Sequence, residues 1–92
     1  MNILKRADQI VNERAEEKER EYGSFPEAME RMKVIFNAMT GLNLETEHMY
    51  IAMVALKFSR QAFAHKEDSL LDAVAYIGAL NNYMEDLKKN QK

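Results

Sequence analysis

Four hydrophobic segments separated by short polar connections run along the chain, and the third of them is the most hydrophobic. It covers residues 45–64 and carries two apolar stripes at helical spacing. The first stripe holds Met49, Met53, Leu56 and Phe63, and the second holds Ile51, Val54, Ala55, Phe58 and Ala62. A helix that is apolar on two sides is usually buried on two sides. Because a chain of 92 residues has few other helices to cover it, we expect a homo-oligomer in which a second copy covers one side.

The other three segments also have the periodicity of amphipathic helices. We expect helices at about residues 2–21, 25–39, 45–64 and 67–89. The connections between them are short, which favours antiparallel neighbours. The sequence therefore predicts an all-α fold, a compact four-helix arrangement in a single domain that covers residues 1–92.

Glycines and cap residues mark where these helices are expected to begin and end. Gly23 and Gly41 suit the left-handed position that follows a helix. Ser24 and Glu27 have the spacing of a capping box at the start of the second helix. Asn43 is a candidate cap for the third helix.

The last helix is predicted to have a face of large residues and a face of small ones. Its core stripe holds Leu70, Val74, Ile77, Leu80 with Asn81, Met84 and Leu87. Its small residues are Ala73, Ala75, Gly78 and Ala79, which allow another helix to approach closely. Glycine inside a helix costs about 1 kcal/mol relative to alanine, so we expect a packing reason for Gly78.

Composition and charge exclude several classes of protein. The net charge of −2 argues against general nucleic-acid binding, which needs a basic excess, but allows one small anionic ligand. The chain has no cysteine, which excludes disulfides and thiolate metal sites. No apolar run approaches the length of a membrane span, and the charged start is a poor secretory signal. We therefore expect a cytoplasmic protein that makes no membrane contact.

The most informative polar residues lie on the third and fourth helices. Lys57 and Arg60 are three residues apart, and Asp68, Asp72 and Tyr76 follow one another at intervals of four. An antiparallel hairpin places the two cations opposite the two carboxylates and the tyrosine. One interpretation is a buried ion-pair network that fixes the register of the helices. The other is a polar pocket, in which arginine supplies a planar fork suited to phosphate or carboxylate.

A second arrangement of acidic residues has the spacing of a metal site. Glu13 and Glu16 are three residues apart, and Asp68 and Asp72 are four apart. Carboxylates from two helices can hold magnesium and so cleave nucleotide phosphates. The layout resembles that of the all-helical nucleoside triphosphate pyrophosphohydrolases of the MazG type, although the second pair is D-x-x-x-D rather than E-x-x-D.

The two histidines and two of the serines are not expected to be catalytic. His48 and His65 lie near helix ends without a second ligand close in sequence, so we expect surface or capping residues. Ser59 and Ser69 have no histidine neighbour in sequence, so nucleophilic catalysis has no positive support.

Three short motifs occur in a fixed order along the chain and point to a family. They are Glu21-Tyr22-Gly23, Lys57-x-x-Arg60 and Asp68-Ser69-x-x-Asp72-x-x-x-Tyr76. Their order and spacing resemble those of small helical proteins common in bacteriophage genomes, some of whose relatives are described as nucleotide-modification-associated domains. The resemblance covers about residues 14–84 and implies a phage origin, an all-helical fold and a link to nucleotides.

The leading functional hypothesis is a non-enzymatic, homo-oligomeric binder of a nucleotide-like ligand that needs no cofactor. Lys57, Arg60 and Arg20 would hold phosphate, Tyr22 and Tyr76 would stack on or hydrogen-bond a base, and Asp68 and Asp72 would orient the cations or accept from the ligand. By analogy with small phage proteins, the ligand would be a host immune signalling nucleotide, sequestered in the host cytoplasm.

Two other functions stay open at this point. One is a magnesium-dependent nucleotide pyrophosphohydrolase of the MazG type, which loses turnover when Asp72 is changed to Asn. The other is a protein–protein inhibitor of a host factor that uses the acidic surface of residues 13–21.

Overall fold

The structure, a computed structural model, describes residues 2–13 and 24–90, except for the side chains of Glu13 and Asn90. Its helices are α1 (Ile3–Asp8), η1 (Gln9–Glu13), α3 (Phe25–Thr40), α4 (Thr46–Phe63) and α5 (Glu67–Asn90). These described residues contain no β-strand, so the prediction of an all-α fold is confirmed. The bounds of α3, α4 and α5 agree with the predicted ranges to within one residue at each end.

The first helix differs from the single α-helix expected over residues 2–21. The backbone is α-helical only to Asp8 and is a π-helix from Gln9 to Glu13. The π-helical turn is wider than an α-turn and changes which side chains face the neighbouring helix. Ile10 and Val11, which follow one another in this turn, both pack against core residues. Residues 14–21 and the predicted stop at Gly23 lie outside the described residues.

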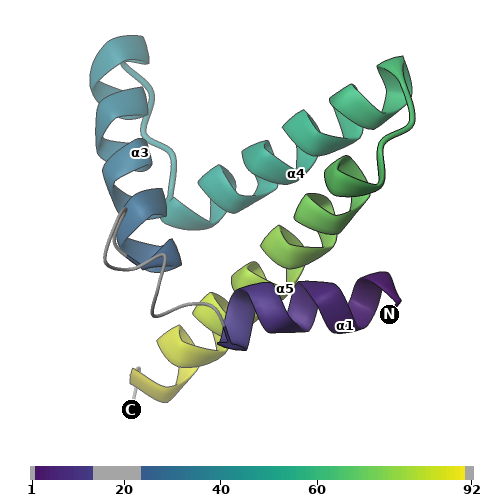
Figure 1. The fold of residues 1–92 in the computed structure, drawn as a ribbon. Helices are drawn as coiled ribbons and strands as arrows, with labels where there is room; N and C mark the ends of the chain where they lie inside the picture. The colour runs from purple at the N-terminus through teal and green to yellow at the C-terminus, as the bar shows by residue number, and fades with distance from the viewer. Residues whose placement is uncertain (1, 14–23, 91–92) are drawn as a thin grey trace.

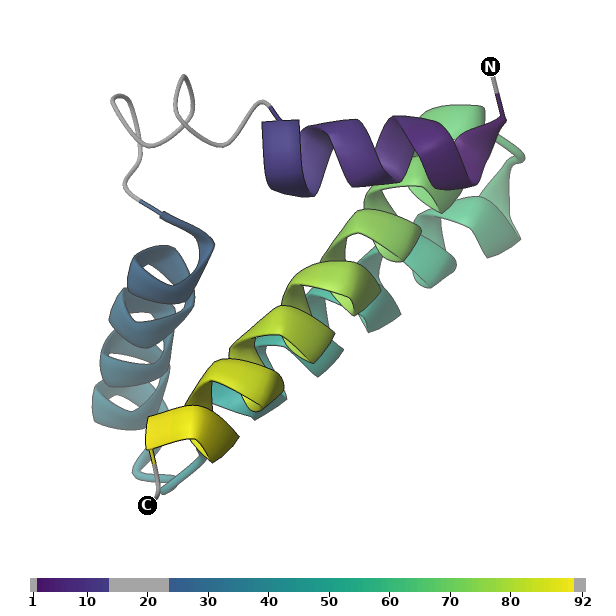
Figure 2. The same ribbon diagram turned by 90° about the horizontal axis from the view of Figure 1, so that it is seen from below.

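The helices are arranged around α5. Helices α4 and α5 form an antiparallel hairpin, and α1 crosses α5 on the side away from α4 (Figures 1 and 2). Helix α3 contacts the beginning of α4 and diverges from it, so the two helices form a V (Figure 1). The Cα radius of gyration is 14.0 Å, whereas a compact domain of this length has about 12.3 Å. The arrangement is therefore more open than the compact bundle that short connections predict.

Local capping bonds explain why α3 begins and ends where it does. The Glu27 N–H donates to the Ser24 hydroxyl at 3.2 Å, and the Ser24 N–H donates to the Glu27 carboxylate at 3.4 Å. The predicted capping box is thus confirmed. Gly41 follows the helix at φ 74°, and its N–H donates to the Asn37 carbonyl at 2.9 Å. The predicted left-handed stop at Gly41 is confirmed as well.

The start of α4 differs from the prediction. Glu45 is its N-cap rather than Asn43, and the Glu45 N–H donates to His48 Nδ1 at 2.9 Å. His48 is therefore a capping residue, which was one of the two roles expected for it. The connection itself is held by Asn37, whose side-chain amide both donates to the carbonyl of Leu44 and accepts from its N–H, each at 3.0 Å. These two bonds fix the main chain of Leu44 against α3 just before α4 begins.

Helix α4 buries only part of its two predicted stripes. Met49 and Tyr50 are fully buried, and Met53 packs against them. Leu56 and Phe63 are 41 % and 94 % exposed, so their prediction as core residues is wrong. The reason is the V: beyond the beginning of α4, α3 no longer runs alongside it. The second stripe also stays largely open to solvent, and its cover by a second copy stays a prediction.

Helix α5 buries its small residues more completely than its large ones. Ala73, Ala75 and Ala79 are at most 4 % exposed, whereas Ile77 of the predicted core stripe is 49 % exposed. Because α5 lies between α4 and α1, small side chains allow both helices to approach it closely. Leu71 is buried with Ala75 against Ala7 of α1, which the predicted stripe did not include.

The two described glycines are expected to respond to alanine in opposite directions. A Cβ at Gly78 would meet Val11 Cγ2 at 4.0 Å, an ordinary contact, so the structure gives no packing reason for this glycine. Gly78→Ala should therefore raise the free energy of unfolding by about 0.5–1 kcal/mol. Gly41→Ala meets no atom within 4 Å but keeps φ at 74°, so it should lower that free energy by about 1 kcal/mol. Urea unfolding of both variants measures these two changes. If the free energy of unfolding changed in the same direction in both variants, the prediction would be contradicted.

The most deeply buried side chain, Tyr50, has no place in the predicted stripes. It is 0 % exposed and packs against Tyr83 with ring centroids 5.4 Å apart. Among the residues that the structure describes, its hydroxyl has no hydrogen-bond partner. Burial, followed by the nearby Tyr83, raises the pKa of Tyr50 to about 12. A tyrosine in the unfolded chain titrates at about 10, so the folded state loses stability as the pH rises from there towards the folded pKa.

Tyr50→Phe should therefore stabilise the protein. At neutral pH the expected gain in the free energy of unfolding is about 1 kcal/mol, since an unpartnered buried hydroxyl is removed. Above about pH 10 the gain should widen, by at most about 1.4 kcal/mol per pH unit, because only the wild type retains a proton that its unfolded chain releases. Urea unfolding of both proteins at neutral and alkaline pH measures the difference. A variant less stable than wild type at neutral pH would show that the hydroxyl has a partner.

Candidate functional site

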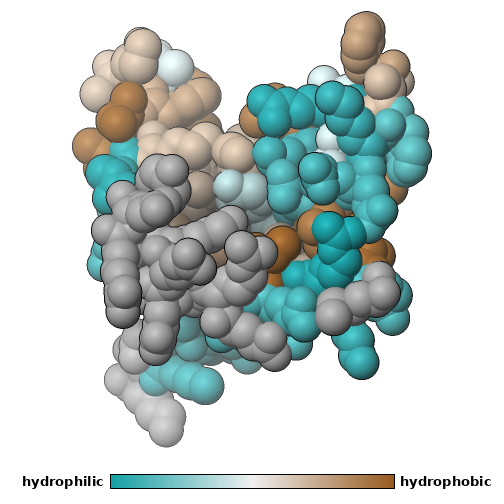
Figure 3. Space-filling view, in the orientation of Figure 1, coloured by the Kyte–Doolittle hydropathy of each residue, from teal (hydrophilic) through white to brown (hydrophobic). Residues whose placement is uncertain are grey.

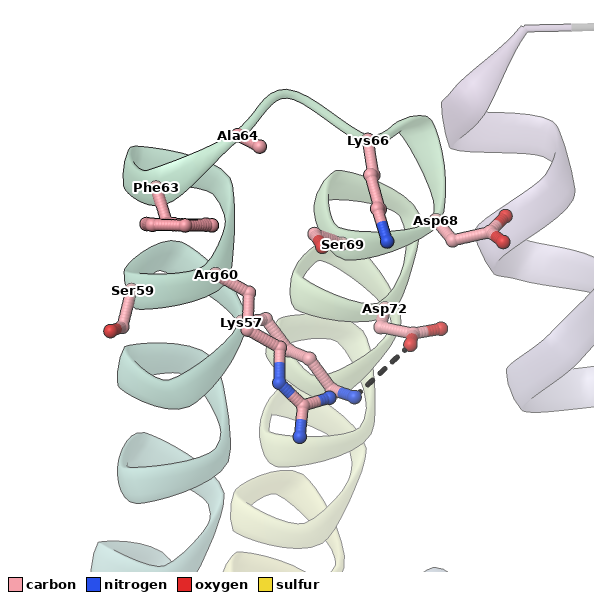
Figure 4. Close-up of a pocket in the computed structure, with 9 residues that line it drawn as sticks. All are labelled: Lys57, Ser59, Arg60, Phe63, Ala64, Lys66, Asp68, Ser69 and Asp72. Atoms are coloured by element: carbon pink, nitrogen blue, oxygen red, sulfur yellow. Dashed lines mark ion pairs between the residues drawn. The ribbon is translucent and has the colours of Figure 1, made fainter.

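The candidate site is an open hollow of about 560 Å³ where α4 ends and α5 begins (Figure 4). The link between the two helices is only three residues long, Ala64 to Lys66, and the helices run antiparallel side by side. This places residues of the last two turns of α4 opposite residues of the first two turns of α5. The hollow is lined by Lys57, Ser59, Arg60, Phe63, Ala64, Lys66, Asp68, Ser69 and Asp72.

Four of the seven predicted site residues meet in this hollow. Lys57 and Arg60 both extend from α4 towards α5, and Lys57 reaches across to the carboxylate of Asp72 on α5 (Figure 4). Lys57 Nζ forms an ion pair with Asp72 Oδ2 at 3.2 Å, and the Lys57 side chain is only 13 % exposed. Asp68 also lines the hollow, but its carboxylate points away from the cations and towards α1 (Figure 4). One carboxylate therefore neutralises one cation.

Arg60 differs from Lys57 in that no described residue pairs with its charge. Within residues 2–13 and 24–90, no ion pair or hydrogen bond involves its guanidinium. A guanidinium has five N–H donors in a rigid fork, and it keeps its charge at any physiological pH. Arg60 is therefore available to bind an anion that enters the hollow.

The structure does not place Tyr76 with the other predicted site residues. Tyr76 is half-buried in the main core cluster, where its ring meets Phe25 edge-on at a centroid distance of 5.5 Å. Burial, and then the charge of Asp72, raises the pKa of Tyr76. Its spacing of four from Asp72 puts it one turn further along α5, where Phe25 of α3 contacts it. The ring is a packing element between α3 and α5.

The aromatic group at the hollow is Phe63, which sequence reasoning assigned to the core. It lies in the last turn of α4, is 94 % exposed and lines the hollow. Lys66 and the two serines, Ser59 and Ser69, were also missed as lining residues. The sequence does hold a signal that Lys66 and Phe63 lie at the hollow. Both residues are next to or within the short link between two helices, and such residues lie at the end of the hairpin.

Two predicted ligand contacts and part of the predicted metal site lie outside the described residues. These are Arg20, Tyr22, Glu16 and the side chain of Glu13. Among the residues that are described, no three histidine or acidic side chains are grouped closely enough to hold a metal ion. Asp68 and Asp72 therefore do not form such a group with other described residues, and the magnesium-dependent hydrolase stays a hypothesis that rests on Glu13 and Glu16.

The other polar contacts connect helices away from the hollow or at its edge. Arg6 of α1 pairs with Glu67 in the first turn of α5. Glu30 of α3 bonds Lys33 Nζ at 2.8 Å and accepts from the buried Thr46 hydroxyl at 2.6 Å. The bond from Lys33 and then that from Thr46 lower the pKa of Glu30. These contacts hold α1 and α3 in place without using Arg60 or Lys66.

Charge and geometry suit the hollow to a small anion. Its lining holds three cations and two carboxylates, and one of those carboxylates is already paired with Lys57. The first turn of α5 adds backbone N–H groups without an intrahelical partner, which favour negative charge nearby. Ser69 supplies a hydroxyl that can donate a hydrogen bond, whereas the Ser59 hydroxyl points away from α5 (Figure 4). The set contains donors for an anion and no nucleophile–base pair.

Comparison with known proteins yields one family. The sequence profile of a domain of unknown function, DUF6378, matches residues 2–84. No curated protein and no solved structure matches the chain. The matched range includes every residue that lines the hollow. Separately, none of the helices among the described residues is long and apolar enough to span a bilayer.

Proposed function

Because the chain belongs to the DUF6378 family of domains of unknown function, we propose a function from its own residues. The hollow between α4 and α5 binds a phosphate-bearing small molecule of nucleotide size and does not alter it chemically. The observation that carries this proposal is the guanidinium of Arg60, which lines the hollow beside Lys57 without a partner among the described residues.

Phosphate is the group that these donors suit best. The planar fork of Arg60 can bind two phosphate oxygens at once, and such charge-assisted bonds are roughly twice as strong as neutral ones. Lys57 gives one contact to Asp72 and has further N–H groups to offer. Lys66 adds a third positive charge at the beginning of α5. Arg20, which the sequence also suggests as a phosphate contact, is not needed for this arrangement.

The size of the hollow and its aromatic edge favour a nucleotide over a bare phosphate. A volume of about 560 Å³ lies within the range of small-molecule pockets. The ring of Phe63 is 94 % exposed at the hollow and offers a face for a base. Stacking of a base on an aromatic side chain contributes about 1–3 kcal/mol. Phe63 thus takes the stacking role that the sequence suggests for Tyr76, and Tyr22 keeps that role as a prediction.

The alternative of a purely structural ion-pair network accounts for only part of the site. Lys57 and Asp72 fit it, because they pair across the two helices and Lys57 is nearly buried. Arg60 and Lys66 do not fit it, since neither has an ion-pair partner among the described residues. A network that only fixed helix register would not need two further cations at the same place.

We also propose the biological setting that the bacteriophage resemblance implies. The protein would be a phage product that acts as a homo-oligomer in the host cytoplasm. There it would sequester a signalling nucleotide of host immunity and so act against host defence. This setting rests on the three motifs and on analogy with other small phage proteins, and it is independent of the geometry of the hollow.

Isothermal titration calorimetry with three probes tests the binding proposal. ADP and inorganic pyrophosphate should bind, with ADP the tighter because its base can stack, and adenosine should bind at least tenfold more weakly than ADP. The affinity for pyrophosphate should fall as salt is raised, since exposed charges are screened. If neither ADP nor pyrophosphate bound with a Kd of about 1 mM or tighter, equivalent to about −4 kcal/mol, the proposal would be overturned.

A further inference from the structure

The outward face of α4 carries four apolar residues in one row. Ile51, Ala55, Phe58 and Ala62 are three or four residues apart, so they lie on one side of the helix. All four are exposed, Ile51 at 52 % and Phe58 at 50 %. Lys57 and Arg60, the only charged residues of α4 after Glu47, lie on the other side and extend towards α5 (Figure 4). We name the row of four the outer stripe.

The outer stripe is unusual for a surface that faces water. It extends for three turns without a charged residue. Contiguous exposed apolar patches on a soluble domain mark interaction sites more often than bare surface. More apolar side chains lie on the outer edge of α3 and at the tip where α4 ends (Figure 3). We therefore expect a binding partner to cover the outer stripe and exclude water from it.

The accessible surface of the chain is larger than that of a compact monomer of the same mass. Its accessible surface is 6787 Å². A compact monomer of 10.7 kDa exposes about 5,500 Å², so the excess is roughly 1,300 Å². A stable dimer buries about 800 Å² on each partner. The excess is thus large enough for such an interface, in agreement with a radius of gyration above that of a compact domain.

The order of residues in the outer stripe fits a second copy of the same helix. Along the stripe, large and small side chains alternate: Ile51, Ala55, Phe58, Ala62. If two such helices pair antiparallel about a two-fold axis near position 56, Ile51 meets Ala62 of the partner subunit, and Ala55 meets Phe58 of the partner subunit. Every large side chain then faces a small one. A surface that complements itself in this way is what an isologous dimer requires.

We propose that the chain forms a homodimer through the outer stripe, with the two α4 helices antiparallel and in this register. Each large–small contact occurs twice because of the two-fold symmetry. The small alanine side chains allow the two helix axes to approach each other to about 8–10 Å, the usual distance between packed helices. A different protein as partner would not require alternation that is symmetric about the middle of the stripe.

This proposal deepens the homo-oligomer part of the proposed function and does not depend on the ligand. The outer stripe and the cations of the hollow lie on different sides of α4. A chain that binds ADP but stays monomeric would overturn the dimer alone. A dimer that binds neither ADP nor pyrophosphate would overturn the ligand proposal alone.

Sedimentation equilibrium over a concentration series tests the dimer. We expect the wild type to have twice the mass of one chain, 10.7 kDa, at micromolar concentration. Ala55→Glu should raise the dimer Kd at least about 100-fold, because two carboxylates are forced into an apolar contact. Met39→Glu is the matched control, since Met39 is an 82 % exposed apolar residue on α3, and it should change the Kd by less than about threefold.

A swap of the central pair tests the register. Ala55→Phe alone sets two phenylalanines against each other, and Phe58→Ala alone leaves two gaps, so each should raise the Kd about tenfold or more. The double variant restores one large and one small residue in each contact and should return the Kd to within a few-fold of wild type. Circular dichroism at 222 nm confirms that each variant is folded. A monomeric wild type, a dimer insensitive to Ala55→Glu, or a double variant no better than the single ones would overturn the proposal.

Discussion

Arg60→Ala should weaken the binding of ADP by about 30-fold, or about 2 kcal/mol, which is the range for a charge-assisted contact to an ionised group. The fold should hardly change, because Arg60 is exposed and has no partner among the described residues. We expect its free energy of unfolding to stay within about 0.5 kcal/mol of the wild-type value. Calorimetric titration and urea unfolding of the same preparation measure the two quantities.

Two control variants sharpen the Arg60 experiment. Arg60→Lys keeps the charge but loses the planar fork, so its affinity should lie between those of wild type and Arg60→Ala. Lys88→Ala removes one positive charge at the far end of α5 and should leave the ADP affinity within about twofold, since screening reduces such distant effects. If Arg60→Ala unfolded the chain, Arg60 would belong to a structural network instead.

Asp72→Asn should strengthen the binding of pyrophosphate by about fivefold, the opposite of what a metal-dependent enzyme requires. The variant removes a negative charge that is 3.2 Å from Lys57 Nζ, so that cation becomes free to face the ligand. A unit charge several ångströms from an anion at a surface contributes about 1 kcal/mol. Because the Asp72 side chain is 42 % exposed, the loss of its ion pair should cost at most about 1 kcal/mol of stability.

The same variant separates the binder from the hydrolase. In a magnesium-dependent pyrophosphohydrolase, Asp72 would be a metal ligand, and Asp72→Asn would abolish nucleotide turnover in the presence of magnesium. Asp68→Asn is the matched control, because the Asp68 carboxylate lines the hollow but points away from the cations (Figure 4). Its effect on pyrophosphate affinity should be smaller than that of Asp72→Asn. If the wild type turned over ADP or a nucleoside triphosphate, and Asp72→Asn abolished that turnover, the proposal of a non-enzymatic binding protein would be refuted.

The parts of the fold that the sequence predicts well depend on local chemistry. The capping box of Ser24 and Glu27 requires only four consecutive residues, and the stop at Gly41 only one left-handed position. The meeting of Lys57 with Asp72 also follows from local facts, namely two long helices and a short link that favours an antiparallel turn. Such features do not depend on where the other helices pack.

The parts that the sequence predicts poorly depend on how helices cross. The divergence of α3 from α4 decides that Phe63 is exposed, and nothing in its stripe distinguishes it from the buried Met49. Tyr76 shares a face with Asp72, but the position of Phe25 places its ring in the core. The π-helical turn from Gln9 to Glu13, which contacts α5, also has no signal in the sequence pattern. Crossing angles of this kind arise from the whole core, not from one segment.

The most direct test of the ligand site is an NMR titration of ¹⁵N-labelled protein with ADP. Amide signals of the hollow, from Lys57 to Asp72, should shift in a saturable way, and those of α1 and of the first two turns of α3 should stay in place. The same titration of Arg60→Ala should show little change at equal ADP concentration. Saturable shifts that are centred elsewhere, or no shifts at about 1 mM ADP, would contradict the assignment of the hollow as a nucleotide-binding site.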